Sequence, residues 1–288
     1  MSEHRRFVLI TGMTGAGRTT AAKVLENLDY YVVDNIPPQL LQQTLTTLTD
    51  SSEIDRIAVV IDARSRGFFG ELTTVLEQLR DVGYRATTLY LEAADQVLVR
   101  RQEAARRPHP LSVEGRLMDG FKRERELLGR IRGRADLVID TTNLNTHQLK
   151  QRVRTAFEDA EIDGLRATIV TFGFKYGVPI DADLIADLRF LPNPFWVDEL
   201  RPQSGLDVPV RDYVLGQDRA EEFLAKYEEL VSLLTDGFLH EDKHFLTIGF
   251  GCTGGRHRSV AMAEAFGDRL RAHGLRTLVV HRDVERDL

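Results

Sequence analysis

The sequence predicts an α/β protein of two domains: a doubly wound parallel sheet at the N-terminal side and a second α/β domain after it. Short apolar, strand-like runs alternate with helical patterns through the first half of the chain, as in βαβ units. A glycine-rich turn joins the first such run to a helical pattern, as in a phosphate-binding loop. The chain has 288 residues, more than one core usually organises.

The first domain is expected over residues 1–161. Its predicted strands are short, rich in β-branched residues and almost continuously apolar, as parallel strands buried on both faces should be. We place these strands at residues 7–11, 31–34, 57–62, 87–91 and 137–140. Helical patterns lie between and after them, at residues 21–28, 39–49, 69–82, 96–101, 113–131 and 146–160.

The turn after the first strand reads GMTGAGRT and has the spacing of a P-loop, except that Arg18 stands where the usual consensus has lysine. Glycines let the backbone N–H groups line a nest, and the following helix points its positive end at the phosphates. A plain glycine-rich turn is the alternative. The predicted nucleotide-binding residues here, in a P-loop kinase-like domain, are Gly12, Met13, Thr14, Gly15, Ala16, Gly17, Arg18 and Thr19.

A carboxylate, Asp62, ends the third predicted strand. In P-loop proteins an acid at this point holds Mg²⁺ together with the loop hydroxyl, so we expect Mg²⁺ at Thr19 and Asp62, with Arg18 and Asp62 as the catalytic residues. The alternative is an aspartate that caps the next turn. The nucleotide site would extend over Asp62, Ala63, Arg64 and Ser65.

A cationic stretch at residues 100–134 contains Arg106 and Arg107, followed by Pro-His-Pro. We interpret this as a lid whose arginines close over the phosphates. Asp34, at the end of the second strand, could accept a proton from a hydroxyl substrate, as in small-molecule kinases. The alternative for Asp34 is an Asx-turn leading into two prolines.

The second domain is expected over residues 162–288, with strands at 167–172, 245–250 and 278–281 and helices at 220–234 and 260–273. Between them, residues 173–210 hold five of the nine prolines and are predicted to be irregular. Within this stretch, RFLPNPFW at 189–196 is rigid and aromatic, which suits a contact between domains or between subunits. We expect the protein to form a homo-oligomer. Burial of Trp196 in the ordinary core is the simpler expectation.

A second phosphate-type loop follows the strand at 245–250, where glycines and cations precede a helix. It could bind a phosphorylated small molecule or an RNA phosphate. Cys252 and Arg258 also match the Cys-x5-Arg-Ser loop of cysteine phosphatases; a small buried cysteine is the alternative. The predicted ligand-binding residues are Lys175, Cys252, Thr253, Gly254, Gly255, Arg256, His257, Arg258 and Ser259; the family resemblance described below adds Arg189.

Composition narrows the compartment and the partners. Apolar residues make up 42% of the chain, enough for a normal core. A net charge of −6 argues against polyanion binding by the whole surface. The single cysteine allows no internal disulfide, and no apolar run reaches the length of a signal core or membrane span. We therefore expect a cytoplasmic protein that does not associate with membranes.

Six motifs, in order, resemble the RapZ/YvcJ family of P-loop nucleotide-binding proteins (the RNase adapter protein family), in an actinobacterial-type version. They cover nearly the whole chain and read GMTGAGRTT, YYVVDNIPPQLL, VVIDARSR, RRPHPL, TFGFKYGVPIDADLIADLRFLPNPFW and GCTGGRHRS. The resemblance implies binding and slow hydrolysis of ATP and GTP at residues 12–19 and 62–65. In enterobacterial members the C-terminal domain binds glucosamine-6-phosphate and small RNAs and presents RNA to an endoribonuclease; residues 252–259, Lys175 and Arg189 match that domain.

The chain also departs from the family pattern. Arg18 replaces a lysine found in many members, and Ala104 stands where a threonine is common. Residues 281–288 alternate in charge and do not match the polybasic tail of the RNA-adapter members. We therefore expect a regulatory protein with weak ATPase and GTPase activity whose second domain binds a phosphorylated metabolite or RNA. The alternatives are a small-molecule kinase using Asp34, an RNA-binding RNase adapter that also contacts a protein partner, and a Cys252 phosphatase.

Overall fold

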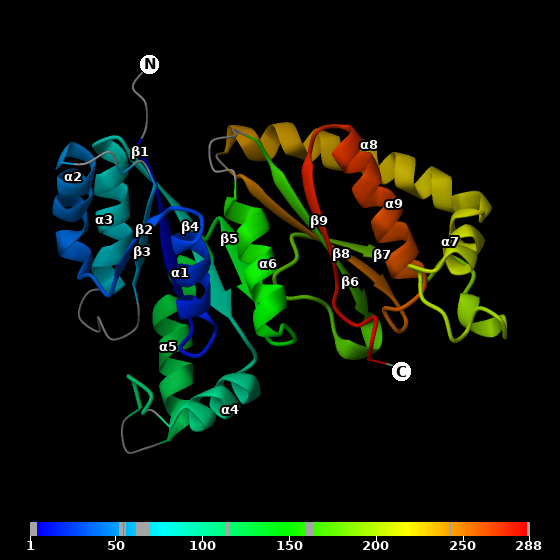
Figure 1. The fold of residues 1–288 in the computed structure, drawn as a ribbon, viewed down its shortest axis with the longest axis horizontal. Coiled ribbons are helices and arrows are strands. Elements are labelled where there is room, and N and C mark those ends of the chain that lie inside the picture. Colours follow the sequence, from blue (N-terminus) through cyan, green and yellow to red (C-terminus); the bar gives the residue numbers. More distant parts are fainter. Residues whose placement is uncertain are drawn as a thin grey trace. The chain divides into compact units, whose positions relative to one another are not determined.

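The computed structural model describes residues 5–51, 54, 56–61, 69–106, 108–112, 116–158, 164–241 and 243–286. The chain divides into two compact units, Met1–Glu158 and Asp159–Leu288, each built on its own sheet (Figure 1). No helix in the described ranges is both long enough and apolar enough to cross a bilayer.

The first unit contains a five-stranded sheet in the order β2-β3-β1-β4-β5, and all of its pairings are parallel. Its central strands are apolar and buried because helices cover both faces. The predicted doubly wound α/β fold is confirmed. The strands are β1 (Arg5–Gly12), β2 (Tyr31–Asp34), β3 (Ile57–Val60), β4 (Tyr84–Glu92) and β5 (Leu137–Asp140).

Two groups of helices cover this sheet. The helix that follows β1 packs on the one that follows β5, while α3 contacts α2 and α5; right-handed crossovers put the two groups on opposite faces. The helices are α1 (Arg18–Glu26), α2 (Leu41–Ser51), α3 (Phe69–Asp81), α4 (Asp95–Ala105), α5 (Leu117–Arg132) and α6 (Thr146–Phe157), with a short 3₁₀ turn at Pro38–Leu40.

The second unit has a four-stranded sheet in the order β7-β8-β6-β9, again with parallel pairings throughout. The predicted second α/β domain is therefore confirmed. Its core includes stacked and edge-on aromatic rings, with Phe250 of β8 against Phe266 and Tyr227. The elements are β6 (Arg166–Gly173), β7 (Leu184–Asp187), α7 (Val208–Leu215), α8 (Asp218–His240), β8 (Phe245–Cys252), α9 (Arg258–Ala272) and β9 (Arg276–His281), with 3₁₀ turns at Phe174–Tyr176 and Pro194–Trp196.

The proline-rich stretch at residues 173–210 is more regular than predicted. It contains β7, a four-residue strand at the edge of the sheet, and the start of α7, where Pro209 lies in the first turn. Proline is tolerated there because the first-turn N–H groups have no partner within the helix. The expectation that Trp196 is buried is wrong: its side chain is 76% exposed.

Candidate functional site

The glycine-rich loop lies at the point where the winding of the first sheet reverses. From β1 the chain crosses to β2, on one side of the sheet. From β4, which is the neighbour of β1, it crosses to β5 on the opposite side. In open α/β sheets, ligands bind beyond the carboxyl ends of the strands at such a switch point. Residues 12–17 cross this position and lead into α1.

Two glycines of the loop are required by their surroundings. Gly12 has φ +132°, and a Cβ at this position would lie 2.0 Å from the Leu91 carbonyl oxygen. Gly17 caps α1 in the left-handed region, and a Cβ there would lie 2.5 Å from Leu149 Cδ2. Met13 anchors the loop to β4. Its side chain is buried, and its N–H donates to the Leu91 carbonyl at 2.8 Å.

Several backbone donors of the loop remain available. The N–H groups of Gly15, Gly17 and Thr19 donate to no group within the described ranges, and they lie at or just before the positive end of α1. A nest of N–H groups at a helix N-terminus is a site for an oxyanion. The arrangement has the chemistry of a phosphate-binding loop.

Two arginines reach the loop. Arg18, half-buried at the start of α1, places Nη1 3.5 Å from the carbonyl of Ile61, just beyond β3. Arg101 of α4 donates to the Gly15 carbonyl at 3.1 Å and to both the hydroxyl and the carbonyl of Thr141. Burial lowers the pKa of Arg101 from its usual value. Arg101 thus joins the loop to the segment after β5, a role that the sequence did not indicate.

Of the remaining predicted residues of the nucleotide site, some lie on the surface and the others fall outside the described residues. Thr19 is exposed on the first turn of α1, and Arg106 is exposed at the end of α4, with φ 51°. The predictions for Asp62, Ala63, Arg64, Ser65 and Arg107 fall on positions outside the described residues. Asp34, the alternative kinase base, is exposed at the end of the edge strand β2.

The oxygen chemistry expected for Mg²⁺ is consistent with Thr19, whose hydroxyl is exposed at the helix start beside the loop. Within the described ranges, no group of three His, Cys, Asp or Glu side chains is arranged to hold a metal ion.

In the second unit, the loop between β8 and α9 lies against the end of β6. Gly173 approaches so closely that a Cβ would come within 2.6 Å of the Gly254 backbone, and Gly255 takes φ +79°. Buried Asp283 accepts the N–H of Gly173 at 2.9 Å and forms an ion pair with Arg282. The tight packing of this loop on β6 therefore depends on glycine on both sides.

The side chains at the start of α9 form a polar cluster under this loop. Cys252 Sγ accepts the N–H of Gly255 at 3.2 Å and lies 3.1 Å from Ser259 Oγ. Arg258 donates to the carbonyl of Leu191 and to the hydroxyl of Thr253. Arg258 is 4% exposed, and its Nε has no hydrogen-bond partner among the described residues. Burial lowers the pKa of Arg258.

The other predicted cations of this site are engaged in different ways. Arg189 lies over the Phe174 ring and forms a bidentate pair with Asp187, which lowers the pKa of that carboxyl. Lys175 lies over the ring of Tyr176. Arg256 donates to three backbone carbonyls, at Pro202, Gln203 and Val284. Arg256 therefore joins its own loop to two other segments, at residues 202–203 and at Val284. Arg189 and Lys175 border the loop through their backbones.

Family models match both units. Residues 6–161 match the RapZ-like N-terminal domain and residues 165–285 match the RapZ C-terminal domain. The chain belongs to the RapZ family. Relatives from Thermobifida fusca, Nocardioides and Streptomyces coelicolor, each named a nucleotide-binding protein, are 52%, 54% and 52% identical to it. The matches cover 97% of this chain and 96%, 93% and 94% of those proteins.

Solved structures resemble about half of this RapZ-family chain. Shikimate kinases from Acinetobacter baumannii and Bacteroides thetaiotaomicron give TM-scores of 0.35 and 0.38 at 16% and 19% identity. Each match covers 54% of this chain, and 94% and 98% of the respective kinase. At these values the likeness carries no argument about substrate.

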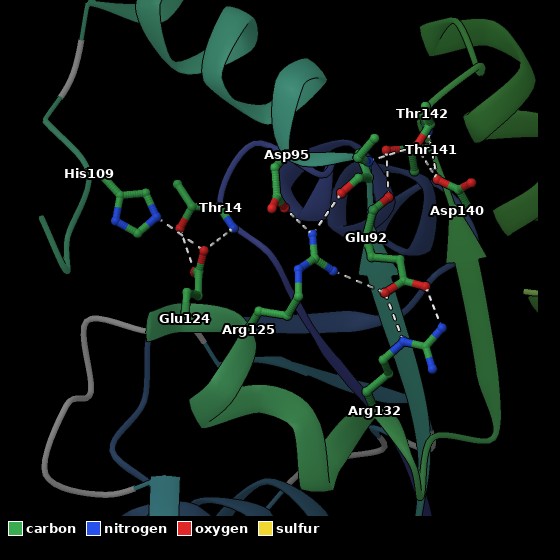
Figure 2. Close-up of polar contacts among 12 residues, drawn as sticks. Thr14, Glu92, Asp95, His109, Glu124, Arg125, Arg132, Asp140, Thr141 and Thr142 are labelled. Carbon is green, nitrogen blue, oxygen red and sulfur yellow. Dashed lines mark hydrogen bonds and ion pairs between the residues drawn. The ribbon is translucent and has the colours of Figure 1, made fainter. Parts of the chain in front are cut away.

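Two buried carboxylates near the first loop were not singled out from the sequence. Glu92, at the end of β4, accepts a bidentate pair of hydrogen bonds from Arg132 at 2.8 Å each, and Arg125 lies 3.6 Å away. Glu124 of α5 accepts hydrogen bonds from Thr14 of the loop itself (Figure 2). The sequence does not reveal that Glu92 and Glu124 are buried, because both lie in or near a part of the chain that is rich in exposed charged residues.

Proposed function

We propose that this RapZ-family chain is a regulatory protein whose first unit binds ATP and GTP with Mg²⁺ and hydrolyses them slowly. The observation that carries the proposal is the loop after β1, where backbone N–H groups at the start of α1 donate to no described residue and Arg18 lies beside them. The names of the relatives, nucleotide-binding proteins at 52–54% identity, support it.

Each residue of the loop would have a separate task. The N–H groups and Arg18 hold the β- and γ-phosphates, since a guanidinium offers two parallel donors to phosphate oxygens. Thr19 and Asp62 would hold Mg²⁺, which when bound neutralises charge on the β- and γ-phosphate oxygens. Arg106 and Arg107 would add positive charge from the lid. Because the proposal assigns no residue as the general base that activates water, we expect hydrolysis to be slow.

For the second unit we propose an anion site at residues 252–259 that binds a phosphorylated sugar of the glucosamine-6-phosphate type. The supporting observation is Arg258, a buried cation at the start of α9 whose Nε has no partner within the part of the chain that the structure describes. A buried unpaired donor is costly, and an anion at the loop would offset that cost. RNA is the competing ligand, and its binding would fall steeply with salt.

The nucleotide proposal is tested with the full chain and a fluorescent ATP analogue in the presence of Mg²⁺. Arg18→Ala should weaken binding roughly 10- to 100-fold, because a charge-assisted hydrogen bond contributes about 1.5–3 kcal/mol. Arg18→Lys should bind with an affinity between those of the wild type and Arg18→Ala, because lysine keeps the charge but lacks the two parallel donors of the guanidinium. Equal affinity in the wild type and in Arg18→Ala, or no binding by the wild type, would remove the proposal.

The sugar-phosphate proposal is tested by calorimetric titration of glucosamine-6-phosphate into the full chain. Thr253→Val, which removes an exposed hydroxyl that accepts from Arg258, should reduce affinity several-fold, and Arg258→Ala should abolish binding. Thermal melts check that both variants fold. If the sugar phosphate does not bind but a structured RNA does, at low salt and not at high salt, the second unit is an RNA-binding domain instead.

A further inference from the structure

Glu124 is a fully buried carboxylate of α5 with three hydrogen-bond donors and no ion-pair partner other than His109 among the described residues. The N–H of Thr14 donates to Oε2 at 2.9 Å, and the Thr14 hydroxyl donates to Oε1 at 2.7 Å. His109 Nε2 lies 3.1 Å from Oε2. Figure 2 shows the three side chains converging from the loop, from α5 and from the segment after α4.

The hydrogen bonds fix the role of each ring nitrogen of His109. The N–H of Leu111 donates to Nδ1 at 3.1 Å, so Nδ1 is the acceptor and carries no proton. Nε2 therefore carries the proton and donates it to Glu124. The segment 108–112, which we call the lid segment, is thus joined through one carboxylate to the phosphate loop.

The lid segment also lies directly on α5. Gly120, in the first half of that helix, has no Cβ, and one built there would lie 2.5 Å from His109 Nδ1 and 3.1 Å from the Ser112 nitrogen. The ring of His109 packs edge-on against Phe121, with ring centroids 4.4 Å apart. Glycine at position 120 is therefore what allows His109 to reach Glu124.

We propose that Glu124 is a positioning residue that couples the lid segment to the phosphate loop. His109 holds the carboxylate, and the carboxylate in turn fixes both the N–H and the hydroxyl of Thr14. The lid segment can then set the conformation of the loop, and hence nucleotide affinity, without touching the phosphates. The expected change in nucleotide affinity rests on the proposed function, whereas the expected change in the conformation of the loop does not.

The physical basis is that a buried carboxylate must keep its donors. Charged hydrogen bonds in a low-dielectric interior are strong, and removing one partner leaves the others to rearrange. When His109 is lost, the Oε2 atom that also receives the Thr14 N–H loses one of its two donors. A coupling of this kind is typically about 5- to 20-fold in affinity, within the range observed between linked sites.

The variants are His109→Ala, which removes the donor, and Gly120→Ala, which displaces His109 and leaves Glu124 and Thr14 chemically unchanged. Two controls lie on the same helix. Gly129→Ala adds a Cβ with nothing within 4 Å, and Glu126→Gln alters an exposed carboxylate. Because alanine is a better helix former than glycine, Gly120→Ala does not weaken α5 itself.

The first measurement is amide hydrogen exchange of the full chain without nucleotide, read on peptides containing Thr14. Faster exchange in His109→Ala and Gly120→Ala, with both controls at the wild-type rate, is the expected result. Unchanged exchange in both variants overturns the coupling, whether or not nucleotide binds. This readout separates the inference from the proposed function.

The second measurement is affinity for the ATP analogue. We expect His109→Ala and Gly120→Ala to bind about 5- to 20-fold more weakly than the wild type, and His109→Ala to have no further effect in a Glu124→Ala background. An equal His109→Ala effect with and without Glu124 means that coupling does not pass through the carboxylate, which overturns the proposal. Unchanged or tighter binding in the single variants overturns it as well.

Discussion

Gly12 shows how one residue fixes the geometry of the proposed nucleotide site. It lies at the junction of β1 and the loop, with a positive φ and its α-carbon against the Leu91 carbonyl. That carbonyl accepts the N–H of Met13, so the backbone of β4 and the start of the loop are packed without room for a side chain. The loop conformation therefore depends on its neighbouring strand as well as on its own sequence.

Gly12→Ala should destabilise the first unit by about 2 kcal/mol or more, since both the backbone strain and the overlap with backbone atoms must be relieved by movement of β1 or β4. The measurement is the denaturant midpoint of the full chain. Gly129→Ala is the matched control and should raise stability by roughly 0.5–1 kcal/mol, because it is a helical glycine with open space around it. Equal midpoints for Gly12→Ala and the wild type would contradict this packing.

At the scale of elements, the loop between β8 and α9 is held by contacts from several segments. His257 is buried at the cap of α9, and its Nε2 lies 3.3 Å from the Arg201 carbonyl, to which it donates. Burial lowers the pKa of His257 below the usual 6.5, and the charges of Arg256 and Arg258 act in the same direction. The folded protein therefore keeps this imidazole neutral to lower pH than the unfolded chain does.

This shift predicts a pH dependence of stability. Above pH 6.5 both states carry a neutral imidazole, and His257 contributes no pH dependence. As the pH falls below 6.5, the unfolded chain binds a proton that the folded state does not, so stability decreases by at most about 1.4 kcal/mol per pH unit until the folded pKa is reached. His257→Gln should flatten this part of the profile in urea titrations at pH 7.5, 6.5 and 5.5.

His147 provides the control, because it is exposed on α6 in the other unit. His147→Gln should leave the profile as in the wild type. A His257→Gln profile that still falls as steeply as that of the wild type would mean that other groups carry the acid sensitivity.

At the scale of the whole molecule, the chain has two compact units with separate sheets. Each unit has one of the two loops proposed to bind an anion, at the carboxyl end of a strand, β1 or β8. A ligand that binds one folded unit stabilises that unit by mass action. Any effect of one ligand on the affinity for the other must be reciprocal.

Calorimetric unfolding of the full chain should therefore show two transitions. Nucleotide at about 100 times its dissociation constant should stabilise the first unit by about 2.7 kcal/mol and raise one transition, and glucosamine-6-phosphate should raise the other. Arg18→Ala, which weakens nucleotide binding, identifies the transition of the first unit. A single transition that both ligands raise together would show that the two units unfold as one.

The sequence predicts elements well where the pattern is local. The strand at Tyr31–Asp34 and the strand at Leu137–Asp140 have the predicted bounds. The start of α6 is also as predicted, because Asn145 and Gln148 form a capping box that the sequence specifies. β7 was not predicted because it has only four residues in a proline-rich stretch, and the alternation of apolar and polar residues over four positions is too short to identify a strand.

Contacts between distant residues explain what the sequence could not supply at the site. Thr14 and Glu124 are 110 positions apart, and on the sequence Glu124 is one acid among many charges of α5. Arg256 had the pattern of an anion-binding residue, yet its guanidinium donates to three carbonyls. Trp196 is exposed at the end of the 3₁₀ turn at Pro194–Trp196, and hydrophobic periodicity does not predict the burial of residues in so short a turn.

The contacts of the phosphate loop have a consequence for synthesis on the ribosome. Residues 12–19 are made early, but Gly12 packs on Leu91 and Gly17 packs on Leu149, so a nascent chain cannot assemble the nucleotide site until both partners have emerged. The second loop needs Asp283, which holds Gly173. At 5–20 residues per second, the first site would be complete roughly ten seconds before the second. If both proposed sites bind their ligands, nucleotide could stabilise the folded first unit during that interval, before the proposed sugar-phosphate site has formed.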